Sequence, residues 1–468
     1  MNEQYIRMTT TPVEKLVGRL AIPTIISMMV TNIYNIVDTA FVGKLGTSAS
    51  GAVGVVFGFM AIIQAVGFMC GQGAGSIMSR KLGEQHIKEA SGYVSTGFFL
   101  ALSLGAVIAI CGGLFLKPLV YLLGSTPTIE PYAIEYIGFI LCAVPFMTSS
   151  FTLNNLLRYE GKAKLGMIGL LTGSIINIGG DALFMFVFDM GVKGAGLATA
   201  LSQIISFCIL LSMFLSGKTQ TTLSIRNIFF SISRIGDICG TGFPSLLRQS
   251  LNSISTVLLN NCAAVYGDYA VSAMSIVSRV TFFVMSIAIG IGQGFQPVSS
   301  FNYGAEKYDR VRKAYWFTFY LAEGLLVLFA IPTFIFGENI IRALRDDPAV
   351  VEFALRALRL QCVTMLTIPI TMVTEMGFQS TGFRGLASFS SSLRSGIIFI
   401  PTLVVLYKVR GEAGIQEAQP VAFVLSFLVF IFLTKLFLSR LKKLEIQKNN
   451  KNDVRNSCKK HVKQYIIK

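Results

Sequence analysis

Two acidic residues lie in stretches that are otherwise apolar. Asp38 ends the stretch Asn32–Asp38, and Asp181 ends the stretch Asn177–Asp181. Asn177 and Asp181 are four residues apart, so on a helix their side chains share one face. An ionised carboxylate is costly in hydrocarbon, and such residues usually mark the path of an ion or a substrate.

Two carboxylates that converge in one poorly hydrated pocket cannot both stay charged without a large cost. Either one of them takes up a proton, or a cation such as Na⁺ neutralises the pair. The amide oxygen of Asn177 would be a further ligand for a small hard cation. Two structural explanations stay open: Asp38 and Asp181 can face water at the ends of their helices, or they can join helices through hydrogen bonds.

The elements that must position these residues are long apolar segments. Of 468 residues, 53% are hydrophobic and 14% are charged, whereas soluble domains carry about 25% charged residues. Apolar runs between charged breaks predict twelve spans, each near the ~20 residues that cross a bilayer. Their centres lie near Met29, Gly67, Gly105, Cys142, Gly173, Ile205, Val257, Met285, Leu325, Met365, Ile400 and Phe427. The sequence therefore predicts an all-α integral membrane protein.

The chain also repeats itself at a fixed offset. Gly71-Gln72-Gly73 and Gly83 recur as Gly292-Gln293-Gly294 and Gly304, and the same offset relates Pro23 to Pro244 and Gly161 to Gly382. The repeat predicts two pseudo-symmetric six-helix bundles, related by an axis along the membrane normal, with the substrate site between them. We expect the repeated glycines to let helices approach closely rather than to bind a dinucleotide.

The boundaries of the apolar spans and of the repeat, together with the charges between the spans, predict the organisation of the chain. We expect an N-terminal lobe over residues 12–225, a cytoplasmic linker over 226–232, a C-terminal lobe over 233–440 and a basic cytoplasmic tail over 441–468. The excess of Lys and Arg in the loops on one side places both termini in the cytoplasm. Residues 439–468, which include this tail, carry half of the net charge of +16, and this position favours an anionic leaflet or solvent over nucleic acid.

The second half does not repeat the acidic pair. At the same offset, Asp38 corresponds to Leu259, Asn177 to Ile398 and Asp181 to Thr402. We therefore expect the ion chemistry in the first half. Other charged residues lie inside the expected spans of the second half, namely Glu323, Glu375, Arg248, Arg279 and Arg394. The glutamates can line a cavity for cations. We expect the arginines to serve packing or to lie near the cytoplasmic ends, and anion binding stays open.

Taken together, these residues resemble the multidrug and toxic compound extrusion (MATE) family from about Val13 to Arg440. The resemblance rests on Ile22-Pro23, Asn35–Gly43, Gly71-Gln72-Gly73 with Gly83, Arg158–Gly161, Asn177 with Asp181, and Gly194-x-Gly196 leading to Thr199. It implies a V-shaped transporter with two lobes that exports organic cations in exchange for protons or sodium ions.

The resemblance also implies roles for single residues. The ion- and proton-coupling site of the first lobe matches Asp38, Asn177, Asp181 and Thr199, of which the first three would hold Na⁺. Pro23 matches a proline at which the first helix bends in some members, although the residues alone equally allow a helix start near Ala21. Another branch of the family carries acids in its seventh and tenth helices. The matching stretches around Leu251 and Ile368 have none, so coupling through the first lobe is expected. We expect the substrate cavity to include Tyr34, Asn35, Asn154 and Glu375.

These expectations describe a secondary active exporter of the cell membrane, not an enzyme, whose only cofactor is its coupling ion. It is expected to act as a monomer on small cationic substrates. The main alternative is a flippase for lipid-linked oligosaccharides, which would need a central cavity rich in Arg and Lys. A third alternative, an intramembrane protease or acyltransferase, lacks support because HExxH and GxSxG are absent. Scattered cysteines and two histidines disfavour a disulfide framework or a zinc site.

Overall fold

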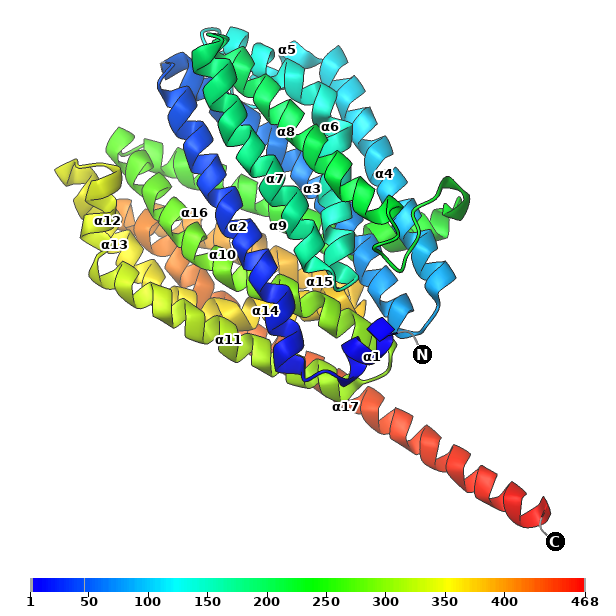
Figure 1. Ribbon diagram of the computed structural model, residues 1–468. Coiled ribbons are helices and arrows are strands. Elements are labelled where there is room, and N and C mark those ends of the chain that lie inside the picture. The colour runs from blue at the N-terminus through cyan, green and yellow to red at the C-terminus, as the bar shows by residue number, and fades with distance from the viewer. Residues whose placement is uncertain (1–2, 46, 467–468) are drawn as a thin grey trace.

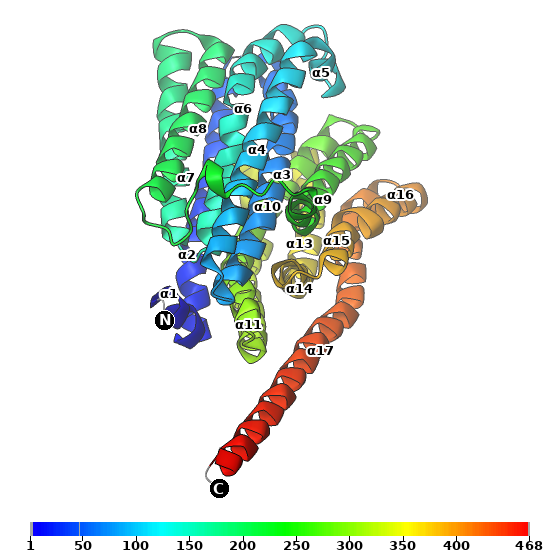
Figure 2. The same ribbon diagram turned by 90° about the vertical axis from the view of Figure 1, so that its right-hand side faces the viewer.

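Long helices make up most of the computed structural model, which describes residues 3–45 and 47–466 (Figure 1). The first half comprises α1 (Glu3–Thr10), α2 (Val13–Gly43), α3 (Thr47–Gly83), α4 (Ile87–Leu114), α5 (Leu116–Leu122), α6 (Glu130–Tyr159), α7 (Ala163–Ala182), a π-helical turn η1 (Leu183–Val187) and α8 (Gly191–Leu215). Helices α2, α3, α4, α6, α7 and α8 form one bundle, which we call the N-lobe (Figure 2).

The second half begins after a connection over residues 216–231, of which the expected linker 226–232 covers the later part. It contains a short helix, η2 (Ile225–Asn227). The C-lobe then comprises α9 (Ile232–Ala264), α10 (Asp268–Gly304), α11 (Tyr308–Ile335), α12 (Gly337–Leu344), α13 (Pro348–Thr364), η3 (Met365–Thr367), α14 (Ile368–Thr381), α15 (Arg384–Ser392), a π-helical η4 (Leu393–Ile398), α16 (Phe399–Arg410) and α17 (Glu412–Ile466). The expected tail is thus helical to Ile466 as the continuation of α17 (Figure 1).

The helices fit the twelve predicted spans. Eleven segments of the described chain are long and apolar enough to cross a membrane. The remaining predicted span is α9, which has 33 residues but a more polar composition. Two of its polar side chains are used inside the protein: Ser245 donates a hydrogen bond to Gln72, and Arg248 donates one to Glu375. Because these groups have protein partners, α9 can lie within the membrane despite its polarity.

The two lobes meet on the side where both chain ends lie, which we call the terminal side, and diverge toward the opposite, far side (Figures 1 and 2). A single apolar core joins both lobes near the terminal side, and it includes Val17 of α2 and Val298 of α10. A second apolar core is confined to the N-lobe and includes Val42 and Tyr136. The lobes therefore share a core at one end only.

The repeated glycines form the seam between the lobes. A Cβ atom on Gly73 would lie 2.2 Å from the Ile238 carbonyl oxygen, and one on Gly242 would lie 1.9 Å from that of Met69. Real Cβ contacts of this kind do not occur, so only glycine lets α3 and α9 approach this closely. The symmetry-related contact joins α10 and α2, where a Cβ on Gly294 would lie 2.6 Å from the Ala21 nitrogen. The structure confirms the predicted role of these glycines.

A second pair of repeated glycines closes the seam at its terminal end. A Cβ on Gly83 would lie 2.1 Å from the carbonyl oxygen of Phe301, and one on Gly304 would lie 2.0 Å from that of Arg80. Arg80 and Phe301 are themselves related by the internal repeat. The ends of α3 and α10 therefore cross backbone to backbone, in a pseudo-twofold arrangement.

Candidate functional site

The acidic pair lies inside the N-lobe, toward the far side. Asp38 is near the end of α2 and is 2% exposed, whereas Asp181 is near the end of α7 and is 0% exposed. Their carboxyl groups interact with one another. The explanation in which both acids face water at helix ends is therefore excluded. Asp181 lies two residues before the π-helical turn η1, a backbone irregularity that often accompanies functional sites.

The side chains around the pair come from four helices. On α7, Asn177 lies one turn before Asp181, and its amide nitrogen donates to the Thr199 hydroxyl of α8 over 3.2 Å. The Tyr136 hydroxyl of α6 lies 3.3 Å from the same Thr199 oxygen. Tyr34, one turn before Asp38 on α2, is also buried and interacts with both carboxyl groups. The four predicted ion-coupling residues and Tyr34 thus lie in one pocket, which we call the acidic pocket.

The acidic pocket contains oxygen atoms that lack hydrogen-bond donors. Within the described chain, no donor reaches Asp38 Oδ1, Asn177 Oδ1, or either carboxyl oxygen of Asp181. Because the nitrogen of Asn177 is already bonded to Thr199, its oxygen is fixed on the opposite side of the amide. Buried oxygens without donors are unfavourable unless a proton or cation joins them. This set of carboxyl and amide oxygens therefore suits a proton or a small hard cation.

The described residues hold no cluster of three or more His, Cys, Asp or Glu side chains that could bind a metal ion. The two carboxylates of the acidic pocket can instead take up a proton or a cation such as Na⁺.

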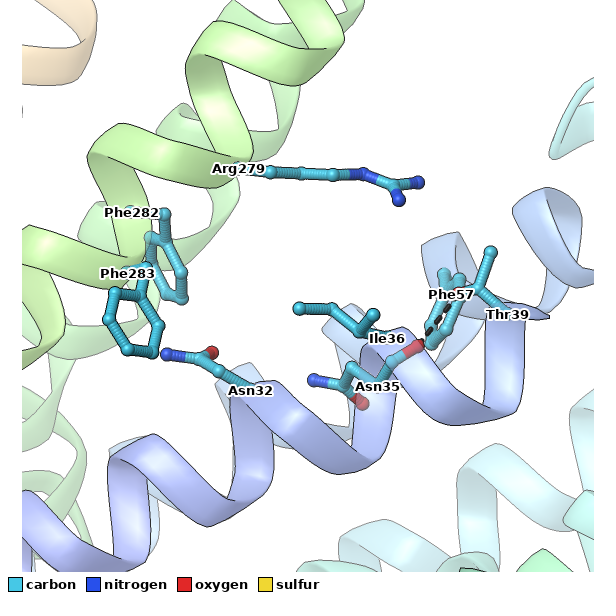
Figure 3. A pocket seen from close by; sticks show the side chains of 8 residues that line it. All are labelled: Asn32, Asn35, Ile36, Thr39, Phe57, Arg279, Phe282 and Phe283. Carbon is cyan, nitrogen blue, oxygen red and sulfur yellow. Dashed lines mark hydrogen bonds between the residues drawn. The ribbon is translucent and has the colours of Figure 1, made fainter. Parts of the chain in front are cut away.

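A separate face of α2 lines the space between the lobes. There the far side carries a cavity of about 270 Å³, which we call the interlobe cleft, bordered on α2 by Asn32, Asn35, Ile36 and Thr39. Phe57 of α3 and Arg279, Phe282 and Phe283 of α10 complete its lining. Figure 3 shows the Arg279 side chain reaching from α10 toward α2, over Ile36. Helix α2 is therefore the wall between the acidic pocket and the interlobe cleft.

A smaller cavity of about 70 Å³ lies closer to the seam. Its polar lining includes Thr24 and Ser27 of α2, Asn154 and Arg158 of α6, and Gln293 of α10. The guanidinium of Arg158 spans the lobes, because it donates to Asn155 of its own helix over 2.5 Å and to the side-chain oxygen of Gln293. The structure thus places two residues that were expected at a cavity in different ones, with Asn35 at the interlobe cleft and Asn154 at this smaller cavity.

Pro23 lies within α2, ten residues after its start at Val13, so the alternative of a helix start near Ala21 is wrong. A proline inside a helix leaves the carbonyl of the preceding turn without its backbone partner. Pro23 stands between Ala21, which contacts Gly294 at the seam, and the residues of α2 that line the cleft. A bend at this proline would therefore move the far part of α2 relative to the seam.

The charged residues of the C-lobe form a separate cluster. Arg248 donates to Glu375 over 2.7 Å, and the Ser391 hydroxyl donates to the same carboxylate over 3.0 Å. Arg394, in the π-helical η4, interacts with both Glu375 and Arg248. Glu375 borders neither cavity described above, and this buried carboxylate forms an ion pair with the partly buried Arg248.

Several residues of these sites did not emerge from sequence reasoning as site residues. Tyr136 is a lone hydroxyl in an apolar helix, and no spacing marks it. Phe282 and Phe283 resemble ordinary core residues of a span. Arg279 was expected in packing or near the cytoplasmic end, but it is exposed at the interlobe cleft, away from the termini. This correction arises because the lobes diverge, so that the face of the far half of α10 that carries Arg279 is not covered by the N-lobe.

Comparisons with known proteins agree with this architecture. The model of the MatE family matches residues 23–183 and again 244–405, one match in each lobe. The multidrug export protein MepA of Staphylococcus saprophyticus is 24% identical over 94% of this chain and 97% of its own length. MepA of Staphylococcus aureus strain N315 is 25% identical over the same shares. A solved multidrug resistance MATE family transporter in an outward-facing conformation superposes with a TM-score of 0.90, at 23% identity, over 95% of this chain and 100% of that chain.

Proposed function

The chain belongs to the MatE family of transporters, and from this premise we propose that it is a secondary active drug exporter driven by an ion that binds in the N-lobe. The observation that carries this proposal is the position of α2. One of its faces holds Asp38 against Asp181, and another lines the interlobe cleft. Occupancy of the acidic pocket can therefore change the shape of the wall that contacts the substrate. The proposal is a transport function, not an enzymatic one, as expected for this family.

The coupling step is an electrostatic one. With both carboxylates charged, Asp38 and Asp181 repel one another in a pocket that offers no donor to three of their oxygens. A proton or Na⁺ removes this repulsion and lets α2 approach α7. A ligand shifts a conformational equilibrium only by its difference in affinity for the two states. The ion must therefore bind more tightly to the arrangement in which the cleft has released its substrate.

Pro23 provides a point at which α2 can bend when the acidic pair is neutralised. The half of α2 before Pro23 is held at the seam through Ala21, whereas the half after it borders both the acidic pocket and the cleft. We infer that neutralisation of the pair bends the far half of α2 at Pro23 and narrows the cleft. The seam between Gly73 and Gly242 must separate in the other phase of the cycle, so that the cleft opens to the terminal side.

The direction of transport depends on the orientation of the chain. The charge asymmetry of the loops supports cytoplasmic termini, in which case the cleft described here opens to the outside of the cell membrane. The relatives that match over nearly the whole chain are multidrug export proteins, which supports export of drugs rather than flipping of lipid-linked oligosaccharides. Organic cations are the cargo that the family resemblance implies, with H⁺ or Na⁺ as the coupling ion. The aromatic rings of the cleft would contact the flat parts of such compounds.

Gradient-driven uptake into inside-out vesicles tests this function. Two fluorescent drugs would be used in parallel: ethidium, a cation, and norfloxacin, which carries a carboxylate as well as an amine. A proton or sodium gradient is imposed on vesicles that contain the wild type, Asp181→Asn, or the control Glu338→Gln, which alters an exposed acid of α12. Accumulation by the wild type and the control but not by Asp181→Asn supports the proposal. Normal accumulation by a well-inserted Asp181→Asn protein would overturn it.

A further inference from the structure

The interlobe cleft carries positive charge and no carboxylate. Its only ionisable side chain among the lining residues is Arg279, which stands beside Phe57, Phe282 and Phe283. The smaller cavity toward the seam likewise has one charged lining residue, Arg158. The interlobe cleft and this smaller cavity are therefore both basic, although the family resemblance leads one to expect cationic cargo.

The carboxylates inside the spans lie elsewhere. Asp38 and Asp181 are buried behind α2 in the acidic pocket, and Glu375 is paired with Arg248. Glu323 lies on α11, and it lines neither of the two cavities. In the part of the chain that the structure describes, a cation in the cleft would thus meet aromatic rings and amides but no carboxylate of a lining residue.

Arg279 is placed to bind rather than to pack. Its side chain is exposed, it reaches across the cleft (Figure 3), and no acid among the described residues pairs with it. A planar guanidinium presents several N–H donors that match a carboxylate, sulfonate or phosphate in a bidentate geometry. The amide groups of Asn32 and Asn35 face the same space from α2 (Figure 3) and can donate further hydrogen bonds.

We propose that the interlobe cleft binds aromatic compounds that bear a carboxylate or another anionic group, with Arg279 holding that group and the three phenylalanine rings contacting the aromatic part. This inference rests on the proposed function only in that the bound compound is the cargo. It names a cargo class different from simple organic cations. Zwitterionic drugs satisfy it, because their carboxylate pairs with Arg279 while the rest of the molecule lies on the rings.

Arg158 adds to the preference for anionic over cationic compounds without binding the cargo itself. Its guanidinium already donates to Asn155 and Gln293, and it has no carboxylate partner in the described chain. It also interacts electrostatically with Arg248. Buried charge of one sign focuses the field into a cleft with low-dielectric walls. The smaller cavity toward the seam should therefore repel a cation and attract an anion.

Two probes with one aromatic core test this proposal. Pyrenebutyrate carries a carboxylate, and pyrenebutyltrimethylammonium carries a fixed positive charge. Their binding to the purified full-length protein in nanodiscs of neutral phosphatidylcholine is measured by fluorescence anisotropy, with empty nanodiscs as the blank. For the wild type we expect the carboxylate to bind more tightly by roughly tenfold or more, since a charge-assisted pair contributes that much to affinity.

Variants assign the preference to one side chain. Arg279→Gln should lower carboxylate affinity about tenfold and leave ammonium affinity unchanged or improved, and Arg279→Glu should reverse the preference. The matched control is Arg359→Gln, which removes an exposed arginine of α13 that stacks on Phe334 and should leave the preference intact. A wild type that prefers the ammonium probe, or a preference that survives Arg279→Gln, would overturn the proposal.

The test separates this inference from the transport function. Probe binding at equilibrium needs no ion gradient, so a carboxylate preference that depends on Arg279 supports the site even if vesicles show no gradient-driven uptake. Conversely, gradient-driven uptake of ethidium together with preferred binding of the ammonium probe would overturn the inference and leave the exporter proposal standing.

Discussion

Asp38 and Thr39 are neighbours in α2, yet Asp38 is buried against Asp181 in the N-lobe, whereas Thr39 lines the cleft between the lobes. A helix turns by about 100° per residue, so adjacent residues can border different compartments. The proposed mechanism therefore needs no long path to connect ion and substrate. In that mechanism α2 separates the two sites, and its position depends on the charge in the acidic pocket.

The protein should be less stable with the native Asp181 in the acidic pocket than with a neutral residue at that position. Both oxygens of Asp181 lack a donor in the described chain, and Asn in its place would remove one charge and could donate to Asp38. We expect Asp181→Asn to stabilise the detergent-solubilised protein by roughly 1–3 kcal/mol at neutral pH, the usual penalty of an unsatisfied buried group. Thermal unfolding at fixed detergent concentration measures this difference. A clear loss of stability would show that the pair is a structural element.

Neutralising the carboxylate of Glu375, which pairs with Arg248 in the C-lobe, should have the opposite effect and destabilise the protein. Glu375→Gln leaves Arg248 and Arg394 facing each other without their shared carboxylate, and removal of one partner of a buried pair costs about 3–5 kcal/mol. Arg248→Gln should cost less, because Arg394 still faces Glu375. The double variant should recover part of the loss seen in Glu375→Gln. Equal losses for both single variants in thermal unfolding would contradict this ranking.

The glycine seam should control which side of the molecule is closed. Ala at position 304 would place a Cβ 2.0 Å from the backbone oxygen of Arg80, so Gly304→Ala should drive the lobes apart at the terminal side and together at the far side. Pulsed electron spin resonance can report this as a shortened distance between labels at Leu122 and Leu344. These residues are 84% and 57% exposed.

The matched control for the seam is Gly324→Ala on α11, where a Cβ would meet nothing within 4 Å. It should leave the distance distribution unchanged, because alanine only favours the helix there. The labels require a background without the native cysteines. An unchanged distance in Gly304→Ala would mean that the seam is not the closed gate of this conformation.

The stability of the protein should depend on pH through Glu160, which holds the connection over residues 216–231. This buried carboxylate accepts from the Thr221 hydroxyl over 2.8 Å and pairs with Lys162 at 3.5 Å. Burial raises the pKa of Glu160 above its ordinary value despite these partners. A raised folded-state pKa gives a contribution to stability that is present at low pH and lost as pH rises through that pKa. Wild type should therefore lose stability relative to Glu160→Gln as pH rises above about 4.3, the ordinary glutamate value. A pH-independent difference between the two proteins would contradict this.

Much of this fold follows from the sequence, for a physical reason. A span must be apolar over its whole length because hydrocarbon cannot satisfy polar groups, so all twelve predicted centres fall in helices. The repeated glycines indicate close helix contacts, since Gly73 and Gly242 tolerate no Cβ. The spacing of Asn177 and Asp181 predicts one shared face, but it cannot show that α7 meets α2. The family resemblance supplied that expectation.

The cleft could not be predicted in the same way. Which face of α10 is exposed depends on the angle between the lobes, a tertiary property that leaves no period in the sequence. Arg279 and the pair Phe282-Phe283 therefore look like packing residues until the divergence of the lobes is known. Tyr136 is hidden for a similar reason, because its role depends on Thr199 from a helix more than sixty residues away.

The central claim, that an ion bound by Asp38 and Asp181 controls the cleft, is tested most directly by thermodynamic linkage. The affinity of the purified protein for the pyrene probe that the wild type binds more tightly would be measured from about pH 6 to pH 9, above the ordinary carboxyl range, and over a range of Na⁺ concentrations. Binding at linked sites is reciprocal, so an exchanged ion must weaken substrate binding. We predict that acid pH or Na⁺ lowers the wild-type affinity and that Asp181→Asn makes it independent of both. An Asp181→Asn protein whose affinity still responds as the wild type does would contradict the account.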